Sequence, residues 1–404
     1  MRIESEHIRL LGDWAPGTAA VANLPFDGGY LVNLEGPIVP SGSDVPPARP
    51  KAGPSLHNRL SPSPGAEGVA VLANNHIMDF GERGLQSSLD GLQAQGLQAV
   101  GAGLDRESAE APLIIDWRDR RVGVLARCET QFGIAHGNGA GVAALGSGLF
   151  EQIRALKTQV DHVIVSVHAA AETVPWPSPQ RQSLFRAMVD AGADVIHGHH
   201  AHVPQGWERY RSGWIFYGLG NFCVDPAKWS LLKHALWSVI PVLSLSEAGI
   251  DVSIETGCVS ADGANIVLRG STTQEHEQHL RYLEKCNSPL EDSDLLEGVW
   301  QEASITLYER YFSQWLGFKK TAPQVVKGVL RETASSLRHL RPAPGGHSAM
   351  GNRERDQMLL RYHLFACDSH RDAIATATGV LGGELPDLRT PRSSALIAEL
   401  MADR

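Results

Sequence analysis

Four of the protein's 17 histidines fall within one short segment, at His197, His199, His200 and His202. The apolar run 194–196 predicts a buried strand that leads into this segment, and Gly198 predicts a sharp turn of the backbone. Imidazoles that leave a strand end together can point their nitrogens at one centre, as the ligands of a metal ion do. A solvated loop that happens to carry histidines is the alternative.

Two carboxylates follow short predicted strands near the start of the chain. Asp13 comes after the apolar run 8–11, and Glu35 comes after the strand predicted at 30–33. Ligands of open α/β sheets bind at the carboxyl ends of the strands, so both carboxylates are candidates for one site. A Gly-Asp pair is also common in ordinary turns, which is the alternative for Asp13.

Two further predicted strands end in groups that could take part in chemistry. The continuous apolar run 68–73 predicts a central parallel strand, and Asn75 and His76 follow it. A later apolar run ends at His168, and Glu172 comes four residues further on. A turn with a capping residue is the alternative for Asn75 and His76, and a structural histidine is the alternative for His168.

The donors collected in this way are carboxylate, amide and imidazole groups, with no thiolate among them. Such a set suits Mn²⁺, Fe²⁺ or Zn²⁺ better than Ca²⁺ or a structural cysteine–zinc site. Two ions close together could share a carboxylate, activate a water molecule and hold an oxyanion. The sequence therefore predicts a divalent metal site with one or two ions.

The composition is that of an ordinary globular protein, with 404 residues of which 43% are hydrophobic and 20% charged. The net charge is -9 and no block of Lys or Arg interrupts it, which argues against nucleic-acid binding. The five cysteines form no Cys-x-x-Cys pair, as expected in a reducing compartment. We predict no membrane span, because the longest apolar run, 235–245, contains Ser and Pro. Without a signal peptide at its start, the chain is expected to be cytoplasmic.

The composition and periodicity of the sequence change near residue 273. Before it, predicted strands and helices alternate, whereas after it Glu, Gln, Leu and Arg dominate and apolar residues recur at helical spacing. We therefore expect an α/β domain at 1–272 and a helical region at 273–404. The helical region could serve as an oligomerisation surface, giving a homo-oligomer, or as a lid over the site.

Several short motifs follow one another in the order found in a known family. They are Asn33-Leu34-Glu35, Asn74-Asn75-His76, Gly198-His199-His200-Ala201-His202 and Tyr217-Gly218-Leu219-Gly220-Asn221-Phe222. Through them the chain resembles the CapA-like poly-γ-glutamate (capsule) biosynthesis protein family, which is related to the calcineurin-like metallophosphoesterases. The resemblance covers roughly residues 8–225 and implies a two-sheet α/β/β/α sandwich.

The resemblance also implies roles for individual residues. The expected metal ligands are Asp13, Glu35, Asn75, His168, His199 and His202, and His76 is expected to be the acid or anion-stabilising group beside them. Apart from the resemblance, we expect His200 and Glu172, which follow predicted strands, to be catalytic as well. His199 and His200 are both candidates for the ligand that pairs with His202. The chain departs from the phosphoesterase pattern at Ala15, where a histidine is usual, and at Glu35, where the bridging residue is usually an aspartate.

These observations lead to two hypotheses of different kinds. The first is a metal-dependent enzyme that acts on a phosphoester or on an acyl or amide bond of a glutamate- or peptide-like substrate, by hydrolysis or by amide formation. The second is a non-catalytic accessory protein that binds a polymer or a peptide in a biosynthetic complex. Bound metal and turnover on model substrates would distinguish the enzyme from the accessory protein.

Overall fold

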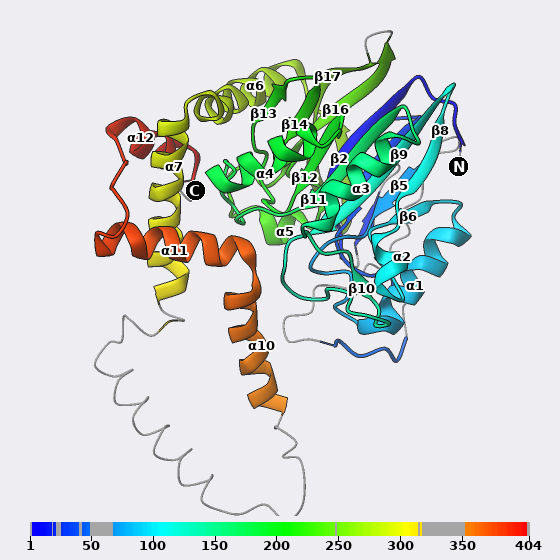
Figure 1. Ribbon diagram of the computed structural model, residues 1–404, viewed down its shortest axis with the longest axis horizontal. Coiled ribbons are helices and arrows are strands. Elements are labelled where there is room, and N and C mark those ends of the chain that lie inside the picture. Colours follow the sequence, from blue (N-terminus) through cyan, green and yellow to red (C-terminus); the bar gives the residue numbers. More distant parts are fainter. Residues whose placement is uncertain are drawn as a thin grey trace, which may run out of the picture.

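The chain forms two β-sheets that pack against each other, with helices outside them and a cluster of helices at the C-terminal end (Figure 1). This computed structural model describes residues 2–17, 19–21, 26–39, 43–48, 68–246, 249–313, 316 and 352–401. The two-sheet α/β sandwich with C-terminal helices confirms the fold class predicted from the sequence.

The larger sheet has nine strands, in the order β3-β18-β17-β16-β2-β4-β5-β6 with β15 also paired to β2. Its strands are β2 (His7–Ala15), β3 (Ala20–Val21), β4 (Gly29–Leu34), β5 (Gly68–Val71), β6 (Gln98–Val100), β15 (Asn221–Val224), β16 (Trp237–Ser246), β17 (Gly249–Asp262) and β18 (Asn265–Gly270). The neighbours β2, β4, β5 and β6 are parallel, so their carboxyl ends meet at one edge.

The second sheet has seven strands in the order β1-β8-β9-β11-β12-β14-β13. Its strands are β1 (Arg2–Ile3), β8 (Leu113–Trp117), β9 (Arg120–Cys128), β11 (His162–His168), β12 (Val195–His199), β13 (Trp207–Tyr210) and β14 (Gly213–Phe216). The central strands β9, β11, β12 and β14 are parallel. A small pair, β7 (Ala102–Gly103) and β10 (Gly141–Val142), lies outside both sheets.

Helices of the α/β part are α1 (Gly81–Ala94), α2 (Arg106–Glu110), α3 (Gly148–Lys157), α4 (Pro179–Asp190) and α5 (Pro226–Trp229). Helix α3 packs on β9 and β11, and α4 packs on β12 and β14. Between the sheets, His197 Nε2 on β12 lies 3.0 Å from the carbonyl oxygen of Leu11 on β2. This contact ties the two sheets together near their carboxyl ends.

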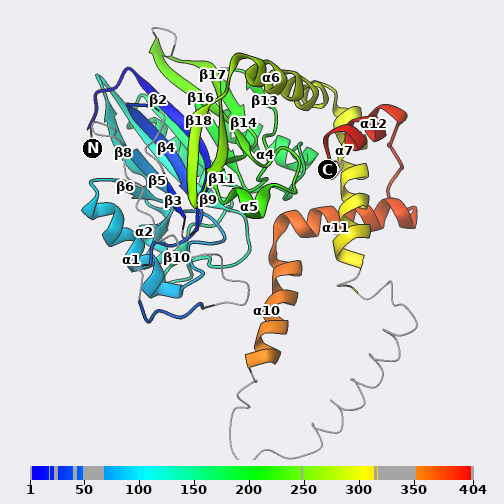
Figure 2. The same cartoon turned by 180° about the vertical axis from the view of Figure 1, so that it is seen from behind.

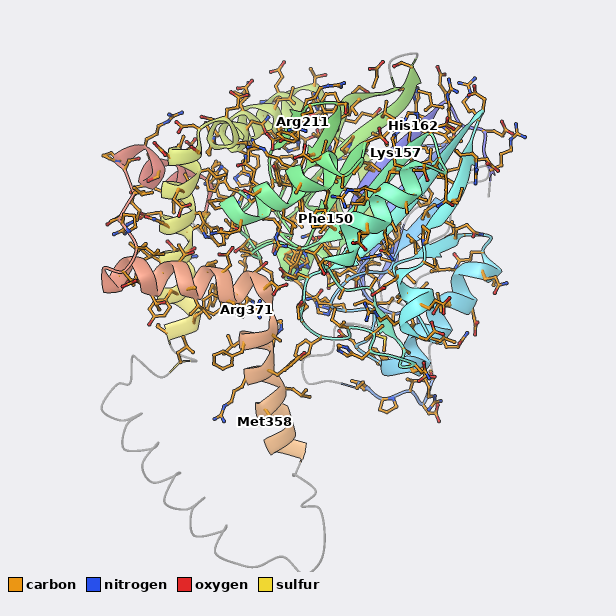
Figure 3. The ribbon with its side chains drawn as sticks, viewed as in Figure 1. Phe150, Lys157, His162, Arg211, Met358 and Arg371 are labelled. Carbon is orange, nitrogen blue, oxygen red and sulfur yellow. The ribbon has the colours of Figure 1, made fainter. Side chains whose placement is uncertain are left out.

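The C-terminal helices are α6 (Thr273–Asn287), α7 (Ser293–Leu307), α10 (Asn352–Ala366), α11 (Asp368–Gly382) and α12 (Pro391–Leu400), with a 3₁₀ turn at Ser288–Glu291 and a π-helical turn at Tyr308–Phe312. Helices α11 and α12 pack against α7, and α10 extends away from them (Figure 2). Arg371 lies on α11, and Met358 lies further out on α10 (Figure 3). The described helices include none that combines the length and the apolar character needed to cross a bilayer.

Some expectations from the sequence are not tested by this structure. The helix predicted at 323–340 and the linker predicted at 342–351 lie outside the described residues, as does most of the loop predicted at 37–64. Strands end at Gly270 and helices begin at Thr273, but the division of the chain into two domains stays a prediction.

The sharp turn predicted at Gly198 is wrong. Strand β12 runs through Gly198 to His199, and the left-handed conformations come after it, at His200 (φ 91°) and His202 (φ 58°). Glycine is needed at 198 for space, because a Cβ there would lie 2.1 Å from the carbonyl oxygen of Tyr217. The two histidines adopt a conformation that side chains with a Cβ rarely take, as residues of functional sites often do.

We expect Gly198→Ala to lower the free energy of unfolding by about 1–3 kcal/mol, because the new methyl group overlaps the Tyr217 carbonyl. Gly270→Ala is the matched control, since nothing lies within 4 Å of the position of its Cβ. Urea unfolding followed by circular dichroism measures both. Equal stability of the two variants would show that β12 and β14 can separate at this point without cost.

Candidate metal centre

The strands of both sheets bring the predicted site residues to one place. Asp13 on β2 pairs in register with Asn33 on β4, and His168 on β11 pairs with His199 on β12. Parallel strands end at the same edge, so residues distant in sequence arrive there side by side. The sites at the ends of the two sheets join, because His199 Nδ1 lies 3.0 Å from Asp13 Oδ1.

Glu35, His200 and His202 form a group that could hold a metal ion. One ligand atom from each residue lies within 4.8 Å of the others, and all three side chains are buried. Both carboxylate oxygens of Glu35 and the Nδ1 atom of His200 have no hydrogen-bond partner among the described residues. Buried polar atoms are normally satisfied, so these atoms fit a cation placed between them.

The second nitrogen of each imidazole in this group has its own partner. His200 Nε2 lies 3.4 Å from Glu129 Oε1, and His202 Nδ1 lies 3.0 Å from Asn221 Oδ1. A metal-ligating histidine typically donates its other N–H to a carboxylate or carbonyl oxygen, which fixes the ring. The arrangement therefore leaves Nδ1 of His200 and Nε2 of His202 free to act as ligand atoms.

The other expected ligands surround this group. Asn33 Nδ2 donates to Asp13 Oδ1 (2.8 Å), and Asp13 Oδ2 lies 3.4 Å from His202 Nδ1. His168 Nε2 lies 3.0 Å from Asn75 Oδ1 and 3.6 Å from Glu35 Oε1.

All six residues expected to bind metal from the sequence thus belong to one buried network: Asp13, Glu35, Asn75, His168, His199 and His202. His200, expected to be catalytic, stands within the group that could hold the ion.

Burial and mutual charge shift the pKa values of these groups. Burial raises the pKa of Glu35 to about 7. Burial alone would lower the pKa of His202, but the charges of Glu35 and Asp13 outweigh it and raise that pKa to about 10. Glu35 and Asp13 thus favour a proton on the imidazole of His202, and its positive charge balances their negative charges. A metal ion bound at the same place would compete with that proton.

His76 and Glu172 border a cavity next to the buried network. His76 Nδ1 lies 2.7 Å from Asp79 Oδ2. Burial alone would lower the pKa of His76, but the hydrogen bond and charge of Asp79 raise it above its ordinary value. Desolvation alone would raise the pKa of Glu172, but the charges of nearby His200 and His202 outweigh it and lower that pKa to about 2. These shifts favour the protonated form of His76 and the ionised form of Glu172.

Glu129 was missed in the sequence, and Asn221 was named there only as part of the motif 217–222, without a role in the site. Glu129 is fully buried, and Arg181 Nη2 donates to its Oε2 atom (2.8 Å). Burial alone would raise the pKa of Glu129, but His200 and Arg181 lower it below its ordinary value. Glu129 directly follows β9, so the same search for ionisable groups at strand ends could have found it.

His197 is the one histidine of the clustered segment whose contacts are structural. Its Nε2 atom lies against the Leu11 carbonyl oxygen, and its Nδ1 atom lies 3.4 Å from Ser166 Oγ. Burial and the nearby charge of His199 lower its pKa well below the ordinary value. His197 is therefore a neutral residue of the core, as the register of β12 requires.

Comparison with known proteins bears on the same residues. The relatives include a capsule biosynthesis protein CapA of Bacillus anthracis, 35% identical over 174 residues, which are 41% of this chain and 42% of that protein. A PGA biosynthesis protein CapA of Bacillus subtilis is 35% identical over 161 residues, covering 38% of this chain and 41% of the relative. A probable polyglutamine synthesis accessory protein of Mycobacterium tuberculosis is 32% identical over 232 residues, covering 52% of this chain and 59% of the relative.

The matches thus span about two fifths to three fifths of these relatives' own lengths. The family model described as bacterial capsule synthesis protein PGA_cap matches residues 29–226. That range contains Glu35, His200 and His202 together with the strand ends that position them. Over residues 29–226, therefore, the chain matches the CapA-like PGA_cap family of bacterial capsule synthesis proteins.

Proposed function

We propose that this chain is a metal-dependent enzyme that acts on a phosphoester or on an acyl or amide bond of a glutamate- or peptide-like substrate in biosynthesis. The observation that supports this best is the buried group Glu35, His200 and His202, whose ligand atoms converge beside a cavity and include unpartnered atoms of Glu35 and His200. The names of the relatives refer to capsule, PGA and polyglutamine biosynthesis, which supports the biosynthetic setting.

In this proposal Glu35, His200 and His202 hold the ion, and Asp13, His168, His199 and Asn75 complete or support its coordination. A divalent ion bound there would supply Lewis-acid activation of a water molecule and of a substrate oxygen. Glu129 and Asn221 keep two of the imidazoles in the orientation that coordination needs. Trp229 covers His202, with ring centroids 4.5 Å apart, and limits access of water from that side.

The residues at the edge of the cavity would handle protons. His76, whose pKa Asp79 raises against the opposing effect of burial, would donate a proton to the leaving atom. Glu172, which the neighbouring imidazoles keep ionised, would accept a hydrogen bond from the attacking group or hold a substrate amine. Hydrolysis and amide formation differ in whether water or an amine attacks, and the proposal includes both.

The alternative is a non-catalytic protein that binds a polymer or a peptide in a biosynthetic complex. The word "accessory" in the name of the Mycobacterium tuberculosis relative favours it. In that case the site would recognise a ligand without turning it over. Oligomer formation through residues 273–404 stays a prediction under either function.

We expect the purified chain to bind Mn, Fe or Zn near stoichiometric amounts, and His202→Ala to lose most of it because a ligand atom is removed. His136→Ala, at an exposed histidine, is the control and should keep its metal. Elemental analysis by plasma mass spectrometry measures all three proteins, with circular dichroism to check folding. Full metal content in His202→Ala would exclude His202 as a ligand, and absence of metal and turnover in the unmodified chain would favour the accessory protein.

We expect Glu129→Gln to weaken metal binding about 10–100-fold, because the carboxylate that orients His200 is lost while every ligand remains. Glu151→Gln, at an exposed position on α3, should leave the affinity unchanged. Competition with a chromogenic chelator gives the dissociation constant. If a folded Glu129→Gln protein bound metal as tightly as the control, Glu129 would have no part in orienting His200.

We expect His76→Gln to lower turnover about 10²–10⁴-fold with unchanged metal content, because a proton donor is lost and no metal ligand is removed. Release of 4-nitrophenol from 4-nitrophenyl phosphate and of 4-nitroaniline from its γ-glutamyl amide are the two assays. Unchanged rates in His76→Gln would remove His76 from the proposed mechanism.

A further inference from the structure

A cavity of about 530 Å³ lies between the metal centre and the C-terminal helices. Part of its lining is polar and comes from the site, with Asn75, His76 and Glu172. Another part is apolar or aromatic and comes from the end of α7 and the turn that follows it, with Leu307, Tyr311 and Phe312. A cavity of this size holds one small molecule.

The cavity directly adjoins the metal centre. Trp229 lines it, and the same ring lies 4.5 Å from that of His202. Asn75 also lines it and lies 3.0 Å from His168. A molecule in the cavity would therefore have one end at the groups that the proposed function treats as the reacting end.

The helical wall is fastened to the α/β part. Ser369 Oγ donates to Glu129 Oε2 (2.5 Å), the same carboxylate that orients His200. Next to it, Thr130 N–H donates to Asp368 Oδ2 (3.0 Å), and the ring of Phe132 stacks on His363 at 4.8 Å. These contacts set the distance between the apolar wall and the metal centre.

The charge of the lining argues against a polyanionic occupant. No described residue of the lining is a lysine or an arginine, and Glu172 is itself an anion. The imidazoles of the lining are His76 at the polar end and His363 and His370 at the helical wall, where burial lowers the pKa of His370 and so disfavours its cationic form. A γ-linked glutamate oligomer carries a free carboxylate on every residue, and each one buried against Leu307 or Phe312 would lack a cationic partner. Unpaired carboxylates are strongly disfavoured in such surroundings.

We infer that the cavity takes a small molecule with one oxyanionic head and an aromatic or branched apolar body, and that it excludes glutamate polymers. The head lies by Asn75 and His76, and the body packs against Tyr311 and Phe312. The inference rests on the proposed function, because it assumes that the reaction takes place at the polar end of the cavity. The apolar residues that would contact the body of the ligand, Leu307, Tyr311 and Phe312, lie outside residues 29–226, the range that the family model matches.

Calorimetric titration of the full chain in the presence of Mn²⁺ tests this without turnover. The ligands are two pairs with matched heads, 1-naphthylphosphonate against methylphosphonate and 1-naphthylacetate against acetate, and a tetramer of γ-linked glutamate. We expect the naphthyl member of at least one pair to bind about tenfold more tightly than its partner, because its rings bury apolar surface. It should also bind more tightly than the tetramer.

Variants of the wall sharpen the test. Tyr311→Ala should weaken binding of the naphthyl ligand about three- to tenfold, since about one ring of apolar contact is lost. Phe365→Ala, on an exposed side chain of α10 outside the cavity, should leave binding unchanged. Tyr311→Arg adds a cation at a half-exposed position and should raise the affinity for the tetramer relative to the naphthyl ligand.

The inference would be overturned if, in both pairs, the naphthyl ligand bound no more tightly than its small partner or did not bind detectably. It would also be overturned if the unmodified chain bound the tetramer more tightly than the naphthyl ligands. Either result in a protein that holds metal and shows turnover would leave the proposed function intact. A naphthyl preference in a protein without metal or turnover would support the cavity assignment and contradict the proposed enzyme. The two proposals therefore fail separately.

Discussion

Buried opposite charges at the joined ends of two sheets are the constraint on which the rest of the structure depends. Asp13 and Glu35 are almost completely buried, and among the described residues they form ion pairs with imidazoles and not with lysine or arginine. Such carboxylates are costly unless a cation balances them, and here either a proton on His202 or a metal ion can do so. The stability of the site therefore depends on which cation lies beside the two carboxylates, a proton on His202 or a bound metal ion.

The backbone around the site is arranged to allow this concentration of side chains. Gly12 and Gly198 let strands approach so closely that a Cβ at either would collide with a neighbouring carbonyl oxygen. Just after β12, His200 and His202 take left-handed conformations that turn two imidazoles towards Glu35. Unfavourable backbone geometry of this kind persists only where surrounding contacts hold it, and the buried partners of both rings provide them.

The C-terminal helices take part in the site through Glu129. This carboxylate contacts His200 on one side, and on the other it accepts hydrogen bonds from Arg181 and from Ser369 at the start of α11. Helix α11, which lies outside the range that the family model matches, thus contacts the site through the carboxylate of Glu129. The same helices supply the apolar wall of the cavity, so one attachment sets both the orientation of an imidazole and the shape of the space beside it.

The sequence by itself determined an α/β domain followed by helices and most of the positions at which strands end, and its resemblance to a known family implied the two-sheet sandwich. Asp13, Glu35, Asn75, His168 and the clustered histidines could be found because apolar runs stop immediately or shortly before them. Only the tertiary structure decided that His197 is a core residue while His200 joins Glu35 and His202. That choice depends on the register of β12 and on left-handed turns, which local periodicity does not specify. The contact of Glu129 with Ser369 likewise required the fold, because it joins segments far apart in sequence and leaves no pattern in either one.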